Sequence, residues 1–375
     1  MTEENIRENY LRIIEAQESI NGRFTKIQRI DPKGGSGSFS LVFRAFDEDT
    51  KKKVALKFYD PNKRGVSYRV KCFEREAEIL DNLRGQKDIL QMIHPLAQFS
   101  RQVIDAGTGL VTPDNLVFFT TELESSNMLQ YIYSDEVTTA RNLQYFRVMV
   151  RGVQRIHNRR ICHRDIKPEN FFRNSKRVVH LGDFGTAKFL DGSMPALDDD
   201  YSYWRGDKRY TAPEQCINIV DKPDMFYIGD IYSLGAILFE MFTRQLLFSV
   251  IFENDFHNSL AEHFNLMSKG SREMMIRELI PDIAKARQLP NIGDYNNEVP
   301  NCIRGRLERL YLGLASIDYT KRTKDFNKIF HELNICEMIL AREKDYSRLI
   351  RLRQLWLENK LKKKDKRPSS GVEIK

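Results

Sequence analysis

The stretch HRDIKPEN, residues 163–170, and the stretch LGDFG, residues 181–185, decide what this chain is expected to be. They place the carboxylates of Asp165 and Asp183 and the carboxamide of Asn170 on two successive loops. Oxygen atoms of these kinds are the ligands that Mg²⁺ prefers, and a carboxylate can also accept the proton of a hydroxyl group. The spacing therefore predicts a site that holds a divalent cation beside a proton acceptor.

Two further features suit the handling of phosphate. Lys167 adds a positive charge beside Asp165, as a migrating phosphoryl group requires. The segment GGSGSFSLVF, residues 34–43, places glycines between two predicted strands, where bare backbone N–H groups can approach phosphate oxygens. A glycine-rich hairpin without any ligand explains that segment equally well, so its meaning depends on the other motifs.

A lysine and a glutamate upstream form a candidate ion pair. Lys57 ends the apolar strand VALK, and Glu76 lies on a predicted helix with apolar residues three and four positions later. Glu74 and Glu78 are close rivals for the same role. A lysine with its head in water and glutamates on a solvated helix face are the plain alternative.

Hydrophobic periodicity divides the chain into a small β-rich part followed by a larger helical part. A polar helix is predicted over residues 3–20. Strands are predicted over residues 24–30, 39–45, 54–59 and 116–121. Helices are predicted over residues 67–84, 139–158, 225–243, 303–316 and 325–340. Two parts of this kind imply two lobes with a cleft between them.

Composition and charge limit the class of protein. Hydrophobic residues make up 41% of 375, which is ample for a core. The five cysteines lack the spacing of a zinc site or a disulfide framework. No signal-like start is seen, and the apolar stretch over 225–243 contains Asp230 and Glu240, so we expect a soluble cytoplasmic protein. Of the formal charge of +8, residues 337–375 supply +6 (twelve Lys/Arg, six Asp/Glu), so we expect no direct nucleic-acid binding.

Together these motifs resemble those of the eukaryotic-type protein kinase family, in order and separation, from about residue 24 to 336. The resemblance implies an α+β, bilobal fold, with a small antiparallel N-lobe sheet, one key helix and a larger, mainly α-helical C-lobe. It divides the chain into an N-terminal helical extension (1–23), an N-lobe (24–123), a C-lobe (124–336) and a basic amphipathic helix with a disordered tail (337–375). The implied activity is ATP-dependent phosphorylation of protein Ser or Thr hydroxyls, with ATP and Mg²⁺ as cofactors.

By this resemblance, one group of residues surrounds ATP. Gly35 and Gly37 would cover the phosphates, while Lys57 would hold the α- and β-phosphates and pair with Glu76. The residues implied to surround the adenine are Val42, Ala55, Phe172, Thr121 and Leu123, with Thr120 guarding the back pocket.

A second group carries the chemistry and its support. Asp165 would accept or orient the substrate hydroxyl with Lys167 beside it, and Asn170 and Asp183 would bind Mg²⁺. The supporting residues implied are Glu214 of an Ala212-Pro213-Glu214 segment, Arg322 as its ion-pair partner, and Asp230. Asp230 would accept backbone N–H groups of the catalytic loop, since an unpaired buried carboxylate costs several kcal/mol.

The chain departs from the family pattern at three positions. Ser40 stands where a third glycine is usual, and Phe172 stands where an aliphatic residue commonly forms the adenine floor. Asp207 stands where Ser/Thr members usually carry a threonine, which brings a further carboxylate toward Asp165. We hypothesise that Asp207 pairs with Lys167 until a substrate displaces it.

Arg164 precedes Asp165, and family members with that arginine often need an anion on the activation segment. The hydroxyl residues of that segment are Ser193, Tyr201, Ser202 and Tyr203. The acidic run over 198–200 would supply the anion permanently. The sequence therefore predicts either autophosphorylation or constitutive activity.

The last predicted helix, which includes Leu349, Leu352 and Trp356, is amphipathic and basic. Docking on its own protein is the favoured interpretation, and contact with a membrane surface or a partner is the alternative. Protein substrates are the expected partners. Two other functions stay open: a catalytically weak kinase-like scaffold and a small-molecule phosphotransferase.

Overall fold

The computed structural model describes residues 3–30, 40–60, 67–104, 111–190, 206–217, 223–252, 256–265 and 267–365. Several residues singled out in the sequence lie outside these ranges. They are Gly35, Gly37, Ser193, Tyr201, Ser202 and Tyr203, together with the acidic run over 198–200 and the end of the expected tail, 366–375.

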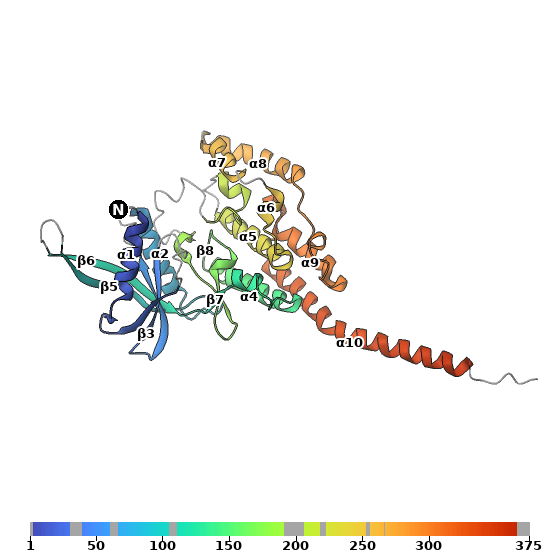
Figure 1. Ribbon diagram of the computed structural model, residues 1–375. Helices are drawn as coiled ribbons and strands as arrows, with labels where there is room; N and C mark the ends of the chain where they lie inside the picture. Colours follow the sequence, from blue (N-terminus) through green and yellow to red (C-terminus); the bar gives the residue numbers. More distant parts are fainter. Residues whose placement is uncertain are drawn as a thin grey trace, which may run out of the picture.

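The N-lobe is built on one antiparallel sheet with strand order β1-β2-β3-β4-β6-β5 (Figure 1). The strands are β1 (Ser19–Ile20), β2 (Phe24–Arg29), β3 (Ser40–Asp47), β4 (Lys52–Tyr59), β5 (Met92–Ile104) and β6 (Val111–Glu122). Alternate side chains of β3, β4 and β6 fill a core that includes Phe43, Phe58 and Phe118. The strands expected over 54–59 and 116–121 fall within β4 and β6, and those expected over 24–30 and 39–45 overlap β2 and β3, whereas β5 was not expected.

Two helices accompany this sheet. Helix α1 (Glu3–Glu15) buries Leu11 and Ile14 in the same core as the sheet's aromatic residues. Helix α2 (Ser67–Asn82) packs Phe73, Ile79 and Leu80 into a second core that continues into the C-lobe. Because α2 shares its core with the larger lobe, it can transmit the position of one lobe to the other.

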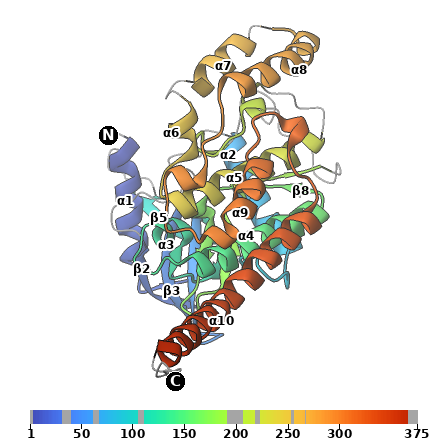
Figure 2. The same ribbon diagram turned by 90° about the vertical axis from the view of Figure 1, so that its right-hand side faces the viewer.

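The C-lobe is mainly helical, as Figures 1 and 2 show. Its longer helices are α4 (Thr139–Asn158), α5 (Pro223–Thr243), α7 (Phe256–Asn265), α8 (Lys269–Ala286), α9 (Asn301–Leu314) and α10 (Phe326–Asp365). Its shorter helical elements are α3 (Met128–Ile132), η2 (Pro168–Asn170), η3 (Phe184–Thr186), η5 (Pro213–Ile217), α6 (Leu247–Ile251), η6 (Ile292–Asp294) and η7 (Tyr319–Lys321). Small antiparallel sheets join β7 (Ser126–Asn127), β9 (Phe171–Arg173) and β10 (Val179–Leu181), and β8 (Ile161–Cys162) with β11 (Lys188–Phe189).

Helix α5 is apolar all round because it lies in the middle of the C-lobe. Its segment Asp224–Thr243 is long and apolar enough to cross a bilayer by composition, but 83% of it is buried inside the fold. An evenly hydrophobic helix of this kind belongs to a protein core. Its two interior carboxylates, Asp230 and Glu240, are both hydrogen-bonded.

Helix α10 changes two expectations about the C-terminal part. The boundary expected at residue 337 falls inside a single helix that runs from Phe326 to Asp365. Ile339 and Leu340 pack against the main core, so the start of this segment docks on its own protein as expected. Residues 351–357, by contrast, are all exposed, with Trp356 at 59%, so the favoured docking is wrong for that stretch. The helix instead projects beyond the rest of the molecule (Figure 1).

Candidate active site

Lys57 connects the two lobes. Its ammonium nitrogen lies 2.7 and 2.8 Å from the Glu76 carboxylate oxygens on α2, and 3.0 Å from Oδ1 of Asp183 in the C-lobe. Burial would lower the pKa of Lys57, but the charges of Asp183 and Glu76 outweigh it and raise the pKa. Burial likewise opposes ionisation of Asp183, yet Lys57 lowers the pKa of Asp183 below its usual range. A cation and an ionised carboxylate therefore face each other across the lobe junction.

The catalytic-loop candidates converge on Asp165. Nζ of Lys167 lies 2.8 Å from Oδ2 of Asp165, and Nδ2 of Asn170 donates to the backbone oxygen of Asp165 at 2.8 Å. The backbone N–H of Gly182 donates to the carbonyl oxygen of Asn170 at 2.9 Å, which brings the following Asp183 alongside. Burial lowers the pKa of Lys167, but the Asp165 charge more than offsets this and raises it.

Asp230 holds the backbone of the loop that carries Asp165. Its Oδ2 accepts the N–H of His163 at 2.8 Å, and its Oδ1 accepts the N–H of Arg164 at 2.9 Å. Nε2 of His157 lies 2.9 Å from the same Oδ2. This buried carboxylate is therefore paired, as its place in an apolar helix required.

Several residues close to Asp165 have positive φ values, which residues other than glycine rarely adopt. Arg164 and Asp183 have φ of 65° and 58°, in the left-handed region, where aspartate is tolerated better than most residues. Gly206 has φ of +93°, and a Cβ there would lie 2.3 Å from the carbonyl oxygen of Arg164. Only glycine lets the chain at 206 approach the catalytic loop so closely, which allows the next N–H, of Asp207, to donate to Oδ1 of Asp165 at 2.8 Å.

The expected pair between Asp207 and Lys167 is absent from the described residues, and a different partner replaces it. Nε of Arg209 lies 2.9 and 3.0 Å from the Asp207 carboxylate oxygens, and Nη2 of Arg209 also reaches Glu169 at 3.0 Å. Burial would raise the pKa of Asp207, but the hydrogen bond from Arg209 dominates and lowers it. The reason is proximity, since a guanidinium two residues away presents a fork that matches a carboxylate.

Glu214 and Arg322 form a buried ion pair. Nη2 of Arg322 donates to Oε2 of Glu214 at 2.8 Å, and Nη1 also contacts Oε1. Both side chains are almost completely shielded from solvent. The pair joins the end of the activation segment to the turn before α10, and so holds the surface next to the catalytic loop.

Strand register places the adenine candidates on one face of the sheet. Val42 pairs with Lys57, and Ala55 pairs with Thr121. Directly paired residues point to the same side, as do residues two apart on a strand. Val42, Ala55 and Thr121 therefore share the face of Lys57, which looks toward Asp183.

The same register corrects the assignment of the residue behind the adenine. Thr120 pairs with Leu56, whose side chain belongs to the outer N-lobe core, and its hydroxyl accepts the N–H of His94 at 2.9 Å. The Thr120 side chain thus lies on the wrong face for the back pocket. Thr121, one residue further along β6, pairs with Ala55 and lies on the face of Lys57 instead.

Leu123 and Phe172 complete the described adenine candidates. Leu123 follows β6 and is partly buried, in the short connection toward β7. Phe172 on β9 is also partly buried, and a Cβ on the neighbouring Gly182 would lie 3.0 Å from its ring. The larger ring at the floor position therefore fits because Gly182 leaves it room.

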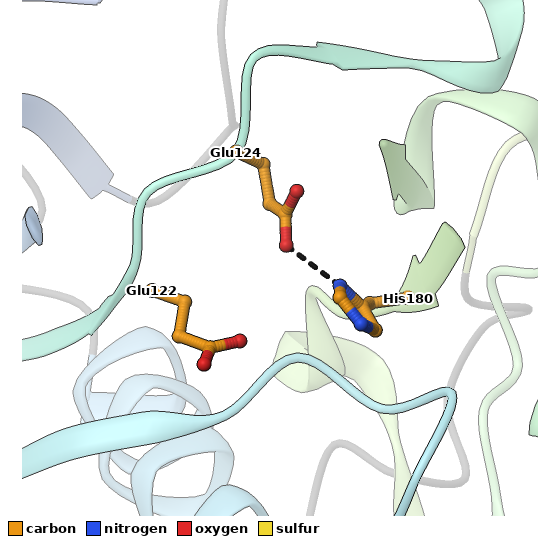
Figure 3. Close-up of side chains that lie close together, drawn as sticks. All are labelled: Glu122, Glu124 and His180. Carbon is orange, nitrogen blue, oxygen red and sulfur yellow. Dashed lines mark hydrogen bonds and ion pairs between the residues drawn. The ribbon is translucent and has the colours of Figure 1, made fainter. Parts of the chain in front are cut away.

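A polar group beside this connection was not foreseen from the sequence. Glu122, Glu124 and His180 offer ligand atoms that all lie within 4.8 Å of one another (Figure 3). Nδ1 of His180 is already 2.7 Å from Oε1 of Glu124, so no cation is needed to explain the arrangement. We interpret it as a contact that ties the link between the lobes to β10.

Sequence reasoning also missed a hydroxyl network below the activation segment. The phenolic O–H groups of Tyr210 and Tyr133 donate to the two oxygens of Glu240 at 2.7 and 2.9 Å. Burial raises the pKa of Glu240, and the two hydroxyls counteract part of this. The only signal in the sequence was a carboxylate within an apolar helix.

Asn170 and Asp183 fit a hard cation. The amide nitrogen of Asn170 is used in bonds to Asp165, so its amide oxygen is the atom that remains as a ligand. Together with the Asp183 carboxylate, this gives oxygen donors of the type that Mg²⁺ takes, and substrate phosphates and water commonly complete such sites.

Comparison with known proteins shows the family of this chain. A family model described as "Protein kinase domain" matches residues 29–328, and the chain belongs to the protein kinase family. Mitogen-activated protein kinase 16 of Arabidopsis thaliana is 32% identical over 223 residues, which are 59% of this chain and 36% of that protein. Mitogen-activated protein kinase homolog MMK2 of Medicago sativa is 28% identical over 220 residues, 57% of this chain and 53% of that protein. The alignments thus span about a third to about half of these two relatives.

Proposed function

We propose that this protein is an ATP-dependent protein kinase that phosphorylates Ser or Thr hydroxyls. The observation that carries the proposal is the continuous network from Glu76 through Lys57 and Asp183 to the loop of Asn170 and Asp165. It joins both lobes around one site and presents a cation, two carboxylates and an amide oxygen. Membership of the protein kinase family supports this interpretation.

In the proposed reaction, the side chains of the chain itself position the reactants. Lys57, fixed by Glu76, would neutralise charge on the α- and β-phosphates. Asp165, oriented by the N–H of Asp207 and by Lys167, would accept the proton of the substrate hydroxyl. Lys167 would stabilise the charge that gathers on the transferred phosphoryl group.

Mg²⁺, held by Asn170 and Asp183, would neutralise charge on the phosphates when bound. Val42, Ala55 and Thr121 would line the adenine from the N-lobe face, and Phe172 and Leu123 would contact it from the C-lobe and the connecting segment. The resemblance implies that backbone groups of residues 121–123 hydrogen-bond to the adenine. Because Thr121 rather than Thr120 shares the face of Lys57, we assign this role instead to the backbone of residues 122–124. Gly35 and Gly37 would cover the phosphates.

Protein substrates and a cytoplasmic location complete the proposal. The described relatives carry names of protein kinases, which supports protein substrates. Lys167 favours Ser/Thr over Tyr by resemblance. In the described part of the chain, no disulfide joins cysteines 72, 162, 216, 302 and 336, which suits a reducing compartment. We propose that the basic helix α10 contacts a membrane surface or a partner through its exposed residues 351–357. Direct nucleic-acid binding is not part of the proposal.

The test is transfer of labelled γ-phosphate by wild type and by Asp183→Ala and Asp165→Asn. We expect wild-type transfer to Ser or Thr, and a loss of at least about 10²-fold in the two variants. Asp282→Asn is the matched control, because Asp282 is 69% exposed and lies on α8, outside the candidate site. If wild type transfers no phosphate, the protein is a kinase-like scaffold. If wild type transfers phosphate to a small molecule but to no protein, it is a small-molecule phosphotransferase.

A further inference from the structure

Helix α1 lies outside the matched kinase domain, which begins at residue 29, yet it is built into the N-lobe. It buries Leu11 and Ile14 against the sheet core, and Tyr10 packs at the margin. Figure 1 shows the helix lying along the sheet.

Arg7 on α1 ties together the ends of two strands. Its Nη1 contacts Oδ2 of Asp60, and its Nη2 donates to the carbonyl oxygen of Ser40 at 3.1 Å. Ser40 is paired with Tyr59 in the sheet, so one guanidinium reaches both β3 and the residue that follows β4. The Asp60 side chain is only 1% exposed, which gives this contact a low-dielectric setting.

A second set of contacts holds the end of β2 to the same helix. Nη1 of Arg29 lies 3.0 and 3.2 Å from the Glu8 carboxylate oxygens, and Nε of Arg29 lies 2.9 Å from Oε2 of Glu15. The backbone N–H of Arg29 also donates to Glu15 at 3.2 Å. Three neighbouring strands are thus fastened to α1 at one end of the sheet.

That end is the one nearest the proposed phosphate position. Along β4, Ala55 on the adenine face comes first, Lys57 follows, and Asp60 lies three residues further. On β3, Val42 is two residues from Ser40. The contacts from α1 therefore act beyond Lys57, on the side away from the adenine.

We propose that α1 positions the nucleotide-binding face, and that Arg7 is a positioning residue for the triphosphate of ATP. The inference rests on the proposed function, because it assumes that Lys57 binds phosphate. Loss of Arg7 would release the paired ends of β3 and β4 and loosen the geometry at Lys57. Binding of the triphosphate should suffer more than binding of the nucleoside, which lies toward Ala55.

The experiment titrates the full chain with Mg²⁺ and AMP-PNP, and separately with adenosine, by calorimetry. For Arg7→Ala we expect the Kd of AMP-PNP to rise at least about fivefold, with the Kd of adenosine changed less than about twofold. Arg7→Lys should fall between, since lysine restores the charge but not the fork. Arg12→Ala is the matched control, because Arg12 lies on the same helix, is 75% exposed and pairs only within it among the described contacts.

The outcomes separate the two proposals. An Arg7→Ala protein that binds both ligands as wild type does, or that loses affinity for both equally, would overturn the positioning role. If Arg7→Ala does not fold, the same comparison is made on Arg7→Lys and on Glu8→Gln/Glu15→Gln, which release the other tie. Wild type that binds neither ligand would instead overturn the proposed function, and the inference with it.

Discussion

At the scale of single residues, the site depends on a glycine that no motif identifies. Gly206 has a φ of +93°, and a Cβ at this position would clash with the Arg164 carbonyl oxygen at 2.3 Å. We predict that Gly206→Ala lowers kcat by about 10²-fold, because displacing this segment removes the N–H of Asp207 from Asp165. Phosphotransfer kinetics measure the loss.

The control for this change is Gly85→Ala, which shares a positive φ (+75°) but meets nothing within 4 Å. It should cost about 1 kcal/mol of stability from backbone strain and leave kcat unchanged. Equal kinetic losses in the two variants would show that strain, not the close approach to Arg164, is responsible.

The placement of a residue was predictable where several motifs pointed to the same position. Lys57, Asp183, Asn170 and Asp230 lie where their types and spacing indicated. Asp207 was not predictable, because its partner was decided by which cation a tight turn brings nearest. Charge alone favoured Lys167 as the partner, and chain geometry selected Arg209.

At the scale of elements, the sequence predicts where a strand lies but not its register with the neighbouring strand. Periodicity identified β6, but a shift of one residue moves every side chain to the opposite face. The choice between Thr120 and Thr121 needed the pairing with β4, which the sequence does not contain. β5 escaped notice because it holds a proline and several polar residues along its 13-residue length.

Contacts between elements can be tested through the buried pair that holds the activation segment. We predict that Arg322→Ala lowers the free energy of unfolding by about 3–5 kcal/mol, since Glu214 would keep a buried, uncompensated charge. Denaturant unfolding measures the change. The neighbouring Lys321→Ala, at a 75% exposed side chain, should change stability by less than about 1 kcal/mol. Similar values for both would exclude a special role for the buried pair.

The contact between the lobe connection and β10 should give the stability a pH dependence. The hydrogen bond to Glu124 raises the pKa of His180, against the opposing effect of burial. A raised folded-state pKa stabilises the fold fully below the unfolded pKa of about 6.5, and this contribution disappears as pH rises through the folded value. We therefore predict that the Tm difference between wild type and His180→Asn is largest in mild acid and shrinks as pH increases.

Thermal unfolding across this pH range, with His331→Asn as control, measures the effect. His331 is exposed on α10, so it reports what replacing a histidine outside this contact does to Tm. A Tm difference for His180→Asn that grows with pH has the opposite sign and contradicts the assigned pairing.

At the scale of the whole molecule, two added helices frame the kinase domain in different ways. Helix α1 is fastened to the sheet by buried apolar residues and ion pairs. The far part of α10 leaves the body, with the described side chains of 351–357 all exposed. Because α1 packs on the sheet, we expect it to affect the nucleotide site. Because the far part of α10 projects from the molecule, we expect it to affect binding to membranes or partners.

Removal of residues 351–375 therefore tests whether the projecting helix serves binding and not catalysis. We predict that the truncated protein keeps its kcat and Tm, because the described side chains of the removed helix contact solvent. Full-length protein should co-sediment with phosphatidylserine vesicles at low salt and be released at high salt, since Leu352, Leu355 and Trp356 are exposed among arginines and lysines. The truncated protein should remain in solution. If both forms bind vesicles, the membrane contact lies in the main body. If neither form binds, α10 contacts a protein partner and not a membrane.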